Sequence, residues 1–140
     1  MSGDTVTARN RRGRTGFEYA LLRVVPRVER GEAVNVGVLV YSQAADHLGV
    51  ATHVDADRLR ALDPGIDVAA VEAVLAGISA VCAGGAGGGL AAELPPGQRF
   101  RWLIAPRSTV VQPGPVHTGL TDDVHAETDR LLERLVLPPR

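Results

Sequence analysis

Lysine is absent from this chain of 140 residues, and all fifteen basic side chains are arginine. Cysteine is nearly absent too: Cys82 stands alone, so neither a disulfide within one chain nor a multi-cysteine zinc site can form, which fits a reducing cytosol. No apolar run reaches the roughly 18 residues of a membrane span, and the first residues lack the apolar stretch of a secretory signal. These absences predict a cytoplasmic protein that does not enter a membrane.

Several well-known catalytic patterns are also missing. The glycine-rich run AGGAGGG at residues 83–89 follows a helical pattern and contains no lysine, whereas a phosphate-binding loop ends in Gly-Lys-Ser or Gly-Lys-Thr and opens a helix. We expect a flexible loop there, because glycine loses the most backbone freedom on ordering. A serine elbow, a His-Glu-x-x-His helix and a dinucleotide fingerprint are absent as well. We therefore expect no cofactor and no metal.

The charges are distributed unevenly along the chain. The net charge is −1, but residues 1–16 hold Arg9, Arg11, Arg12 and Arg14 against Asp4 alone. We assign residues 1–16 to a flexible basic N-terminal arm and residues 17–140 to a single α+β domain, since 140 residues suit about one domain. A basic arm can hold phosphate backbones, although a short terminus with few apolar residues is commonly disordered and without a role.

Alternating apolar residues predict strands at residues 17–28, 33–42, 47–54 and 99–105, with a glycine-containing turn at residues 29–32. Helical spacing and capping residues predict helices from residue 55 or 56 to 62, from a cap at 67 to 83, and from 121 or 122 to 137. Strands and helices do not alternate regularly. The predicted fold is therefore α+β, with a mainly antiparallel sheet that opens with a β-hairpin and packs with about three helices.

The predicted hairpin gives Arg23 an unusual environment. If the turn centres on residues 30 and 31, Arg23 faces Val38, while Asn35 and Gly37 lie on the opposite face. The side chains that share the face of Arg23 are then apolar: Tyr19, Leu21, Val25, Val34, Val36 and Val38. A guanidinium left unpaired on an apolar face costs several kcal/mol. Arg23 must therefore pair with an internal carboxylate such as Glu18 or Glu72, send its head group to water, or open onto a cleft.

The hairpin carries other charges as well. Glu29 and Glu32 repel each other across the expected turn, and Arg27 and Arg30 offset that repulsion, which indicates a structural role for these four residues. Arg27 and Asn35 nevertheless belong to the same predicted hairpin segment as Arg23. We include all three in a candidate site for an anionic ligand or a protein partner.

A second polar group lies in residues 105–120, APRSTVVQPGPVHTGL, which the prolines predict to be a fixed loop. Arginine suits bidentate binding of phosphate or carboxylate, hydroxyl and amide groups complete an oxyanion clasp, and histidine exchanges a proton near neutral pH. The alternative is that these side chains satisfy loop backbone or pack under the last helix. The candidates here are Arg107, Ser108, Thr109, Gln112 and His117.

The blocks FEYALLRVVPRVERGEAVNVGVLVY and RFRWLIAPRSTVVQPGPVHTGL resemble the two signature blocks of the bacterial domain of unknown function 3037 family. The resemblance covers residues 17–136. The family has no established activity, but its genes are described beside HipA-like kinase genes, which implies a partner or regulator of such a kinase. The family pattern has an aromatic residue where this chain has Ala33, and a serine where it has Gly114. The second change removes a hydroxyl from the candidate site.

Three functions are compatible with these features. The first is a small binding or regulatory protein whose arginines dock on an acidic partner, such as a HipA-like kinase. The second is a protein that binds phosphate-bearing ligands or nucleic acid, with the basic arm as an anchor. The third is a hydrolase or phosphotransfer enzyme that uses His117, for which no nucleophile, carboxylate pair or metal set is visible. We favour binding over catalysis, with Arg23 and Arg107 facing a shared hollow.

Overall fold

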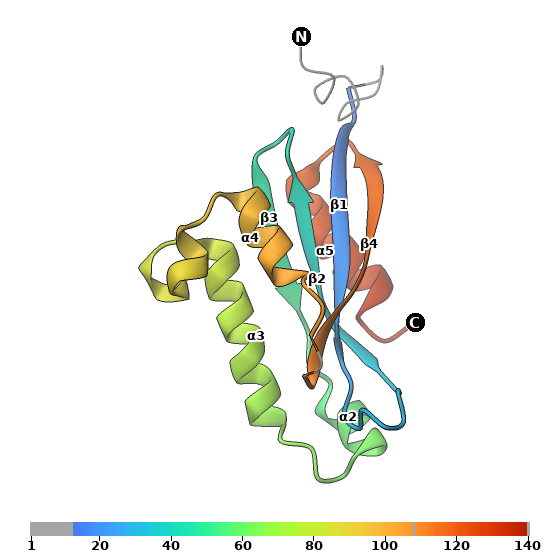
Figure 1. Ribbon diagram of the computed structural model, residues 1–140. Coiled ribbons are helices and arrows are strands. Elements are labelled where there is room, and N and C mark those ends of the chain that lie inside the picture. Colours follow the sequence, from blue (N-terminus) through green and yellow to red (C-terminus); the bar gives the residue numbers. More distant parts are fainter. Residues whose placement is uncertain (1–12, 108, 140) are drawn as a thin grey trace.

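A four-stranded antiparallel sheet forms the centre of the computed structural model, which describes residues 13–107 and 109–139. The strand order is β3-β2-β1-β4 (Figure 1). Residues 1–12 of the predicted arm lie outside the described residues, and the first strand begins at Thr15, two residues earlier than predicted. The strands are β1 Thr15–Val24, β2 Val34–Ser42, β3 His47–Thr52 and β4 Val111–Thr121.

Helices cover the sheet on both faces. In Figure 1, α3 and α4 lie in front of the sheet and α5 lies behind it. The prediction of an α+β fold that opens with a β-hairpin is confirmed. Within the described ranges, no helix has both the length and the apolar character needed to cross a membrane. The helices are α2 Ala56–Leu62, α3 Val68–Ala83, α4 Pro96–Leu103 and α5 Val124–Leu135, with short 3-10 turns η1 Ala86–Gly88 and η2 Leu90–Glu93.

Helix α3 forms where its apolar spacing predicts it. Asp67 caps its start, since the carboxylate accepts a hydrogen bond from the Ala70 N–H. One stripe of the helix is buried, and it ends at Gly84, whose φ of +79° favours glycine. The buried stripe consists of Val71, Leu75, Ile78, Val81 and Cys82.

The sheet separates two apolar clusters. Leu22 and Val24 of β1 pack in the larger cluster with α3 and α4, whereas Phe17 packs in a smaller cluster with Val124 and Leu131 of α5. Alternate residues of a strand point to opposite faces, so a strand buried on both sides reads as a continuous apolar run. This explains the apolar sequence of β2.

The predicted strand at residues 99–105 is wrong, because this segment forms helix α4. Pro96 at the first helical turn presets the backbone angle of a helix. Phe100 and Leu103 are buried at a spacing of three residues, whereas Trp102 is 46% exposed. The alternation of large apolar residues resembled a strand, but the buried pair follows the helical period.

The predicted loop at residues 105–120 is also wrong over most of its length, because Val111–Thr121 forms β4. β4 contains Pro113 and Pro115 and lies at the edge of the sheet. Proline has no N–H to donate, and an edge strand tolerates it because one side of the strand has no neighbour in the sheet. Prolines that appeared to mark a loop therefore mark an edge strand.

The predicted hairpin register is wrong as well. Arg23 lies opposite Asn35, not Val38, and the two side chains share a face. The connection spans residues 25–33 and contains a short turn in which the N–H groups of Arg30 and Gly31 donate to the Arg27 carbonyl, at 3.1 and 3.2 Å. A longer connection shifts the pairing of every residue before it. The register shifts beside Gly37, where a β-carbon would stand 3.0 Å from the Ala51 carbonyl oxygen.

Candidate functional site

Three predicted site residues form a polar row across the sheet. Asn35 on β2 and Gln112 on β4 each lie opposite Arg23 on β1, so their side chains share the face that α5 packs on. Asn35 Nδ2 donates to the Leu135 carbonyl at the end of α5, at 3.0 Å. Gln112 Nε2 donates to the Thr109 carbonyl at 2.8 Å. The outer members of the row are thus held by backbone groups.

Arg23, at the centre of this row, is not held in the same way. Its Nε is buried and has no hydrogen-bond partner among the described residues. The suggested partner Glu18 is bound instead by Arg101 Nη2 at 2.9 Å. Arg23 lies against Gly114, where a β-carbon would stand 3.5 Å from Nε. Of the carboxylates suggested for Arg23, Glu18 is therefore engaged by Arg101.

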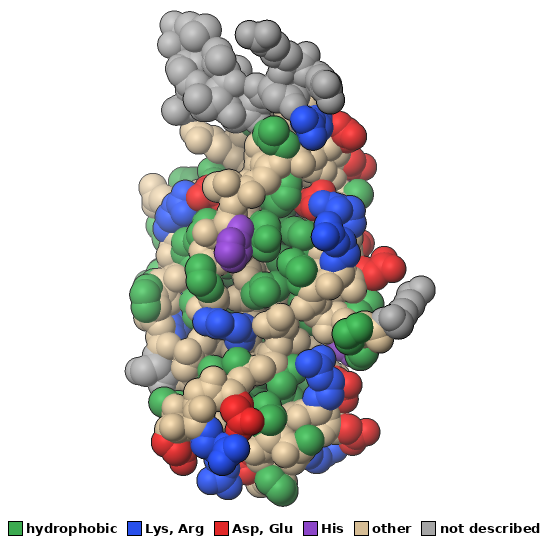
Figure 2. Space-filling view, turned by 90° about the vertical axis from the view of Figure 1, so that its right-hand side faces the viewer, with side chains coloured by type: hydrophobic (Ala, Val, Ile, Leu, Met, Phe, Trp, Pro, Cys, Tyr) green, Lys and Arg blue, Asp and Glu red, His purple; other side chains and the backbone are tan. Residues whose placement is uncertain are grey.

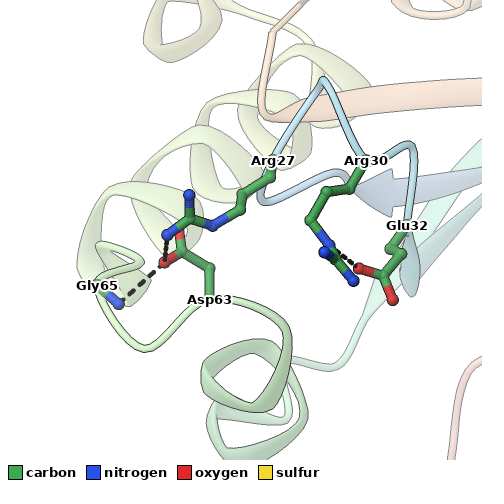
Figure 3. Close-up of polar contacts among 5 residues, drawn as sticks. All are labelled: Arg27, Arg30, Glu32, Asp63 and Gly65. Atoms are coloured by element: carbon green, nitrogen blue, oxygen red, sulfur yellow. Dashed lines mark hydrogen bonds and ion pairs between the residues drawn. The ribbon is translucent and has the colours of Figure 1, made fainter.

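The hairpin charges pair locally, as Figure 3 shows. Arg27 Nη2 lies 3.3 Å from Asp63 Oδ1, which also accepts the Gly65 N–H at 3.1 Å. Arg30 Nε lies 2.5 Å from Glu32 Oε1. These pairs are largely exposed, so each contributes little to stability. They tie the β1–β2 connection to itself and to the turn after α2.

Two other predicted residues line a hollow beside α3. Arg107 and Thr109 contribute to its wall, and the hollow has a volume of about 450 Å³. Arg107 Nη2 donates to the Trp102 carbonyl at 2.8 Å, and its guanidinium lies 4.6 Å from the centre of the Trp102 ring. The rest of the lining is mainly apolar: Ile66, Ala70, Val71, Val74, Val110 and Val111, with Asp67.

The two groups lie on opposite sides of the sheet. Val24 and Val111 are paired and belong to the core cluster with α3, so the hollow is on that side. Arg23, the next residue along β1, points to the other face. The structure therefore does not bring Arg23 and Arg107 into one hollow. Ser108 lies outside the described residues.

His117 lies on β4, away from both groups. It is exposed and opposite Tyr19, with ring centres 5.1 Å apart. Asp123 caps α5 by accepting hydrogen bonds from the N–H groups of His125 and Ala126. Across residues 13–107 and 109–139, no group of three or more histidine, cysteine or acidic side chains is arranged to hold a metal ion.

Sequence reasoning missed the exposed apolar residues at the hollow. Val74 is 48% exposed on α3 and Val110 is 42% exposed just before β4. Val74 lies three residues from the buried Val71, at a spacing that also suits a buried position, but no other element covers it completely. Neither side chain carries a polar or titratable group, so sequence reasoning that looks for such groups does not select it.

A histidine pair was missed as well. His47 on β3 and His125 on α5 approach with ring centres 4.6 Å apart. Burial, and then the neighbouring His125, lower the pKa of His47 below its usual 6.5. Its Nε2 is buried without a hydrogen-bond partner among the described residues, as is Thr128 Oγ1. The two histidines are far apart in sequence, so no spacing rule connects them.

Comparison with known proteins gives one match. Residues 19–136 match the model of the family described as "Protein of unknown function (DUF3037)". This range contains both the polar row and the hollow. No curated protein and no solved structure matches the chain.

Proposed function

We propose that this chain, which belongs to the DUF3037 family, is a protein-binding module that takes an apolar side chain of its partner into the hollow beside α3. The observation that carries this proposal is the combination of an apolar wall with Arg107 and Thr109. Concave surfaces that are mainly apolar with a few fixed polar groups are typical binding sites.

The apolar wall supplies the driving force for binding. Val74 and Val110 are large apolar residues that remain 48% and 42% exposed, on two segments that meet at the hollow. Covering such side chains removes apolar surface from water and stabilises a complex. The hollow, at about 450 Å³, is large enough to admit a large apolar or aromatic side chain of a partner, and a side chain buried in a pocket can carry much of the binding energy of an interface.

Arg107 gives the site its charge preference. The Trp102 carbonyl accepts a hydrogen bond from Arg107 Nη2, and the guanidinium lies over the Trp102 ring. A guanidinium has five N–H donors, so the others can reach a carboxylate of the partner. Asp67 also lines the hollow, but its carboxylate is engaged in capping α3. We infer a partner segment with an apolar residue next to an acidic one.

The other two candidate functions have less support. Four of the described arginines are in ion pairs with carboxylates: Arg27, Arg30, Arg101 and Arg130. A surface for phosphate or nucleic acid instead needs several arginines free to contact phosphate groups. For an enzyme, His117 would need a nucleophile or a carboxylate within reach, whereas its imidazole lies against the Tyr19 ring.

The test measures binding of the full chain to a HipA-like kinase, which the family resemblance makes the first partner to try. Val74→Asp and Val110→Asp place a charge in the hollow, and each should weaken binding about 30-fold or more, as expected for a central interface residue. Val28→Asp is the matched control, because Val28 is 60% exposed in the β1–β2 connection, outside the hollow. Isothermal titration calorimetry gives the affinities.

Arg107→Met tests the charge preference separately. It should weaken binding to a partner with an acidic contact residue, and less so when that acidic residue is replaced by its amide. If the two aspartate variants bind as tightly as Val28→Asp, the hollow is not the binding site and the proposal fails. If no binding occurs with any form of the chain, the kinase is not the partner.

A further inference from the structure

The turn η2 carries the most exposed large apolar side chain of the described residues. Leu90 is 86% exposed, although leucine is among the residues most often fully buried. The segment that contains η2 follows α3, and in Figure 1 this part of the chain, coloured yellow, projects to the left beyond the upper end of the helix. Figure 2 shows the opposite side of the molecule, where hydrophobic side chains lie between charged ones. Leu90 therefore stands on a projecting turn that a second molecule can reach.

Glu93 lies on the same side of η2 as Leu90. This turn is a 3-10 helix, in which side chains three residues apart eclipse each other. The two residues between them are covered: Ala92 is buried, and Ala91 packs against the larger apolar cluster. Leu90 and Glu93 are both exposed. The turn thus presents an apolar side chain next to a carboxylate, which is the chemistry that we infer for a partner of the hollow beside α3.

We propose that Leu90 of one copy of this chain enters the hollow beside α3 of a second copy, where Glu93 pairs with Arg107; this rests on the proposed function of the hollow as a site for an apolar side chain. The hollow of about 450 Å³ has an apolar wall that includes Val74 and Val110, and Arg107 is the basic residue of its lining. One N–H group of Arg107 binds the Trp102 carbonyl, so other donors of the guanidinium are available to the Glu93 carboxylate.

Helix α3 keeps the turn and the hollow of one chain apart. The α3 residues that line the hollow end at Val74, whereas η2 is held beyond the other end of the helix, where the Gly85 N–H donates to the Ala92 carbonyl at 3.3 Å. Between Val74 and Ala83 the helix rises by about 14 Å. Leu90 is not part of the lining of the hollow in its own chain. The contact therefore needs a second copy.

The contact joins two different surfaces, so the copies associate head to tail. A pair retains one free turn and one free hollow, and association continues as the concentration rises. The net charge of −1 produces little repulsion between the copies. A partner with the same chemistry competes with η2 for the hollow, so self-association covers this apolar surface when that partner is absent.

Two variants with complementary defects test the contact. Leu90→Asp removes the apolar side chain and keeps the hollow, whereas Val74→Asp blocks the hollow and keeps Leu90. Each alone should associate about 30-fold more weakly than the native chain, as expected for a central interface residue. Mixed in equal amounts, they should form a complex of two chains, with twice the mass of 14.7 kDa, because one intact turn meets one intact hollow.

Sedimentation velocity from micromolar to millimolar concentration measures these masses. Val116→Asp is the control and should associate like the native chain, since Val116 is 37% exposed on β4 and belongs neither to η2 nor to the lining of the hollow. Glu93→Arg and Arg107→Glu should each weaken association, and both changes in one chain should restore it, because the ion pair is then reversed.

Three results would overturn the proposal: a native mass of one chain at every concentration, association of Leu90→Asp as tight as that of the native chain, or no complex in the mixture. Each leaves the proposed function to be judged by its own measurement, the binding of Val74→Asp to the kinase. Loss of kinase binding in Val74→Asp, with full binding in Leu90→Asp and no self-association of the native chain, would overturn the second copy and keep the hollow as a binding site.

Discussion

The guanidinium of Arg23 lies against Gly114, so closely that a β-carbon on this glycine would stand 3.5 Å from Arg23 Nε and 3.6 Å from Arg23 Cζ. Nε is buried and has no hydrogen-bond partner among the described residues. A buried donor without a partner costs about 1–3 kcal/mol. Gly114 is therefore a position at which one added hydroxyl can change the stability of the fold.

Gly114→Ser should stabilise the chain relative to Gly114→Ala. The space around Gly114 permits a β-carbon at ordinary contact distance, and a serine hydroxyl would then reach Arg23 Nε as an acceptor. One such hydrogen bond contributes about 1 kcal/mol, which corresponds to a rise of about 3 °C in the melting temperature. Thermal unfolding of both variants at one protein concentration measures the difference. Equal melting temperatures for serine and alanine would contradict the prediction.

Replacing Arg23 supplies the control for this prediction. In an Arg23→Met background, the serine hydroxyl has no guanidinium to contact, so the advantage of Gly114→Ser over Gly114→Ala should disappear. An advantage that persists would mean that the hydroxyl binds a backbone group instead.

The ion pair between Glu18 and Arg101 should couple helix α4 weakly to strand β1. Arg101 Nη2 lies 3.0 and 2.9 Å from the two carboxylate oxygens of Glu18, but the Arg101 side chain is 56% exposed. Water and salt screen such a pair, so a double-mutant cycle with Glu18→Gln and Arg101→Met should give a coupling of about 0.5 kcal/mol. Chemical unfolding at low and high salt checks this. A coupling that does not decrease in 1 M salt would mean that the two side chains interact by packing.

The sequence predicts the elements whose local signals agree with their tertiary environment. Helix α3 has a capping aspartate, a buried stripe and a terminal glycine, and it forms where these signals place it. Helix α4 and strand β4 were missed because their local signals conflict with their surroundings. Trp102 stays exposed and so imitates the alternation of a strand, and Pro113 occurs in a strand that only an edge position permits. Edge positions depend on the order of strands, which no local pattern contains.

The candidate site was predicted only in its parts. Residue types singled out Arg23, Asn35 and Gln112, but their alignment in one row depends on the register, which the length of the β1–β2 connection decides. Arg107 was singled out for its charge, whereas its place beside an apolar hollow depends on Val74 and Val110, which carry no chemical signal. Sequence reasoning therefore finds polar groups more readily than the apolar surfaces that surround them.

The His47 imidazole should make stability depend on pH. Burial, followed by the nearby His125, lowers the pKa of His47 in the folded chain below its usual 6.5. Between the lowered pKa of the folded chain and pH 6.5, the unfolded chain binds more protons at His47 than the folded chain does. The free energy of unfolding therefore falls as the pH drops from 6.5 toward the lowered pKa. Above pH 6.5, where His47 is neutral in both states, this loss of stability is absent. Chemical unfolding between pH 5 and pH 8 measures this slope.

His47→Gln should flatten that slope, because glutamine does not titrate. His125→Gln should reduce it only in part, since burial is the larger cause of the lowered pKa. A wild-type slope that is unchanged in His47→Gln would assign the pH dependence to other groups.

Gly49→Ala should destabilise the chain, because a β-carbon on Gly49 would stand 2.9 Å from His47 Nε2 and 3.0 Å from Thr128 Oγ1. Inserting a methyl group into a filled space costs about 1–3 kcal/mol. Gly77→Ala is the matched control: Gly77 lies within helix α3 with no atom near its β-carbon position, so alanine there should stabilise the helix by about 0.5–1 kcal/mol. Relief of the contact at Gly49 requires the imidazole to move outward, so the pKa of His47 in Gly49→Ala should rise toward 6.5 in a proton-NMR titration. A destabilised Gly49→Ala with an unchanged His47 pKa would show instead that the strand backbone moves.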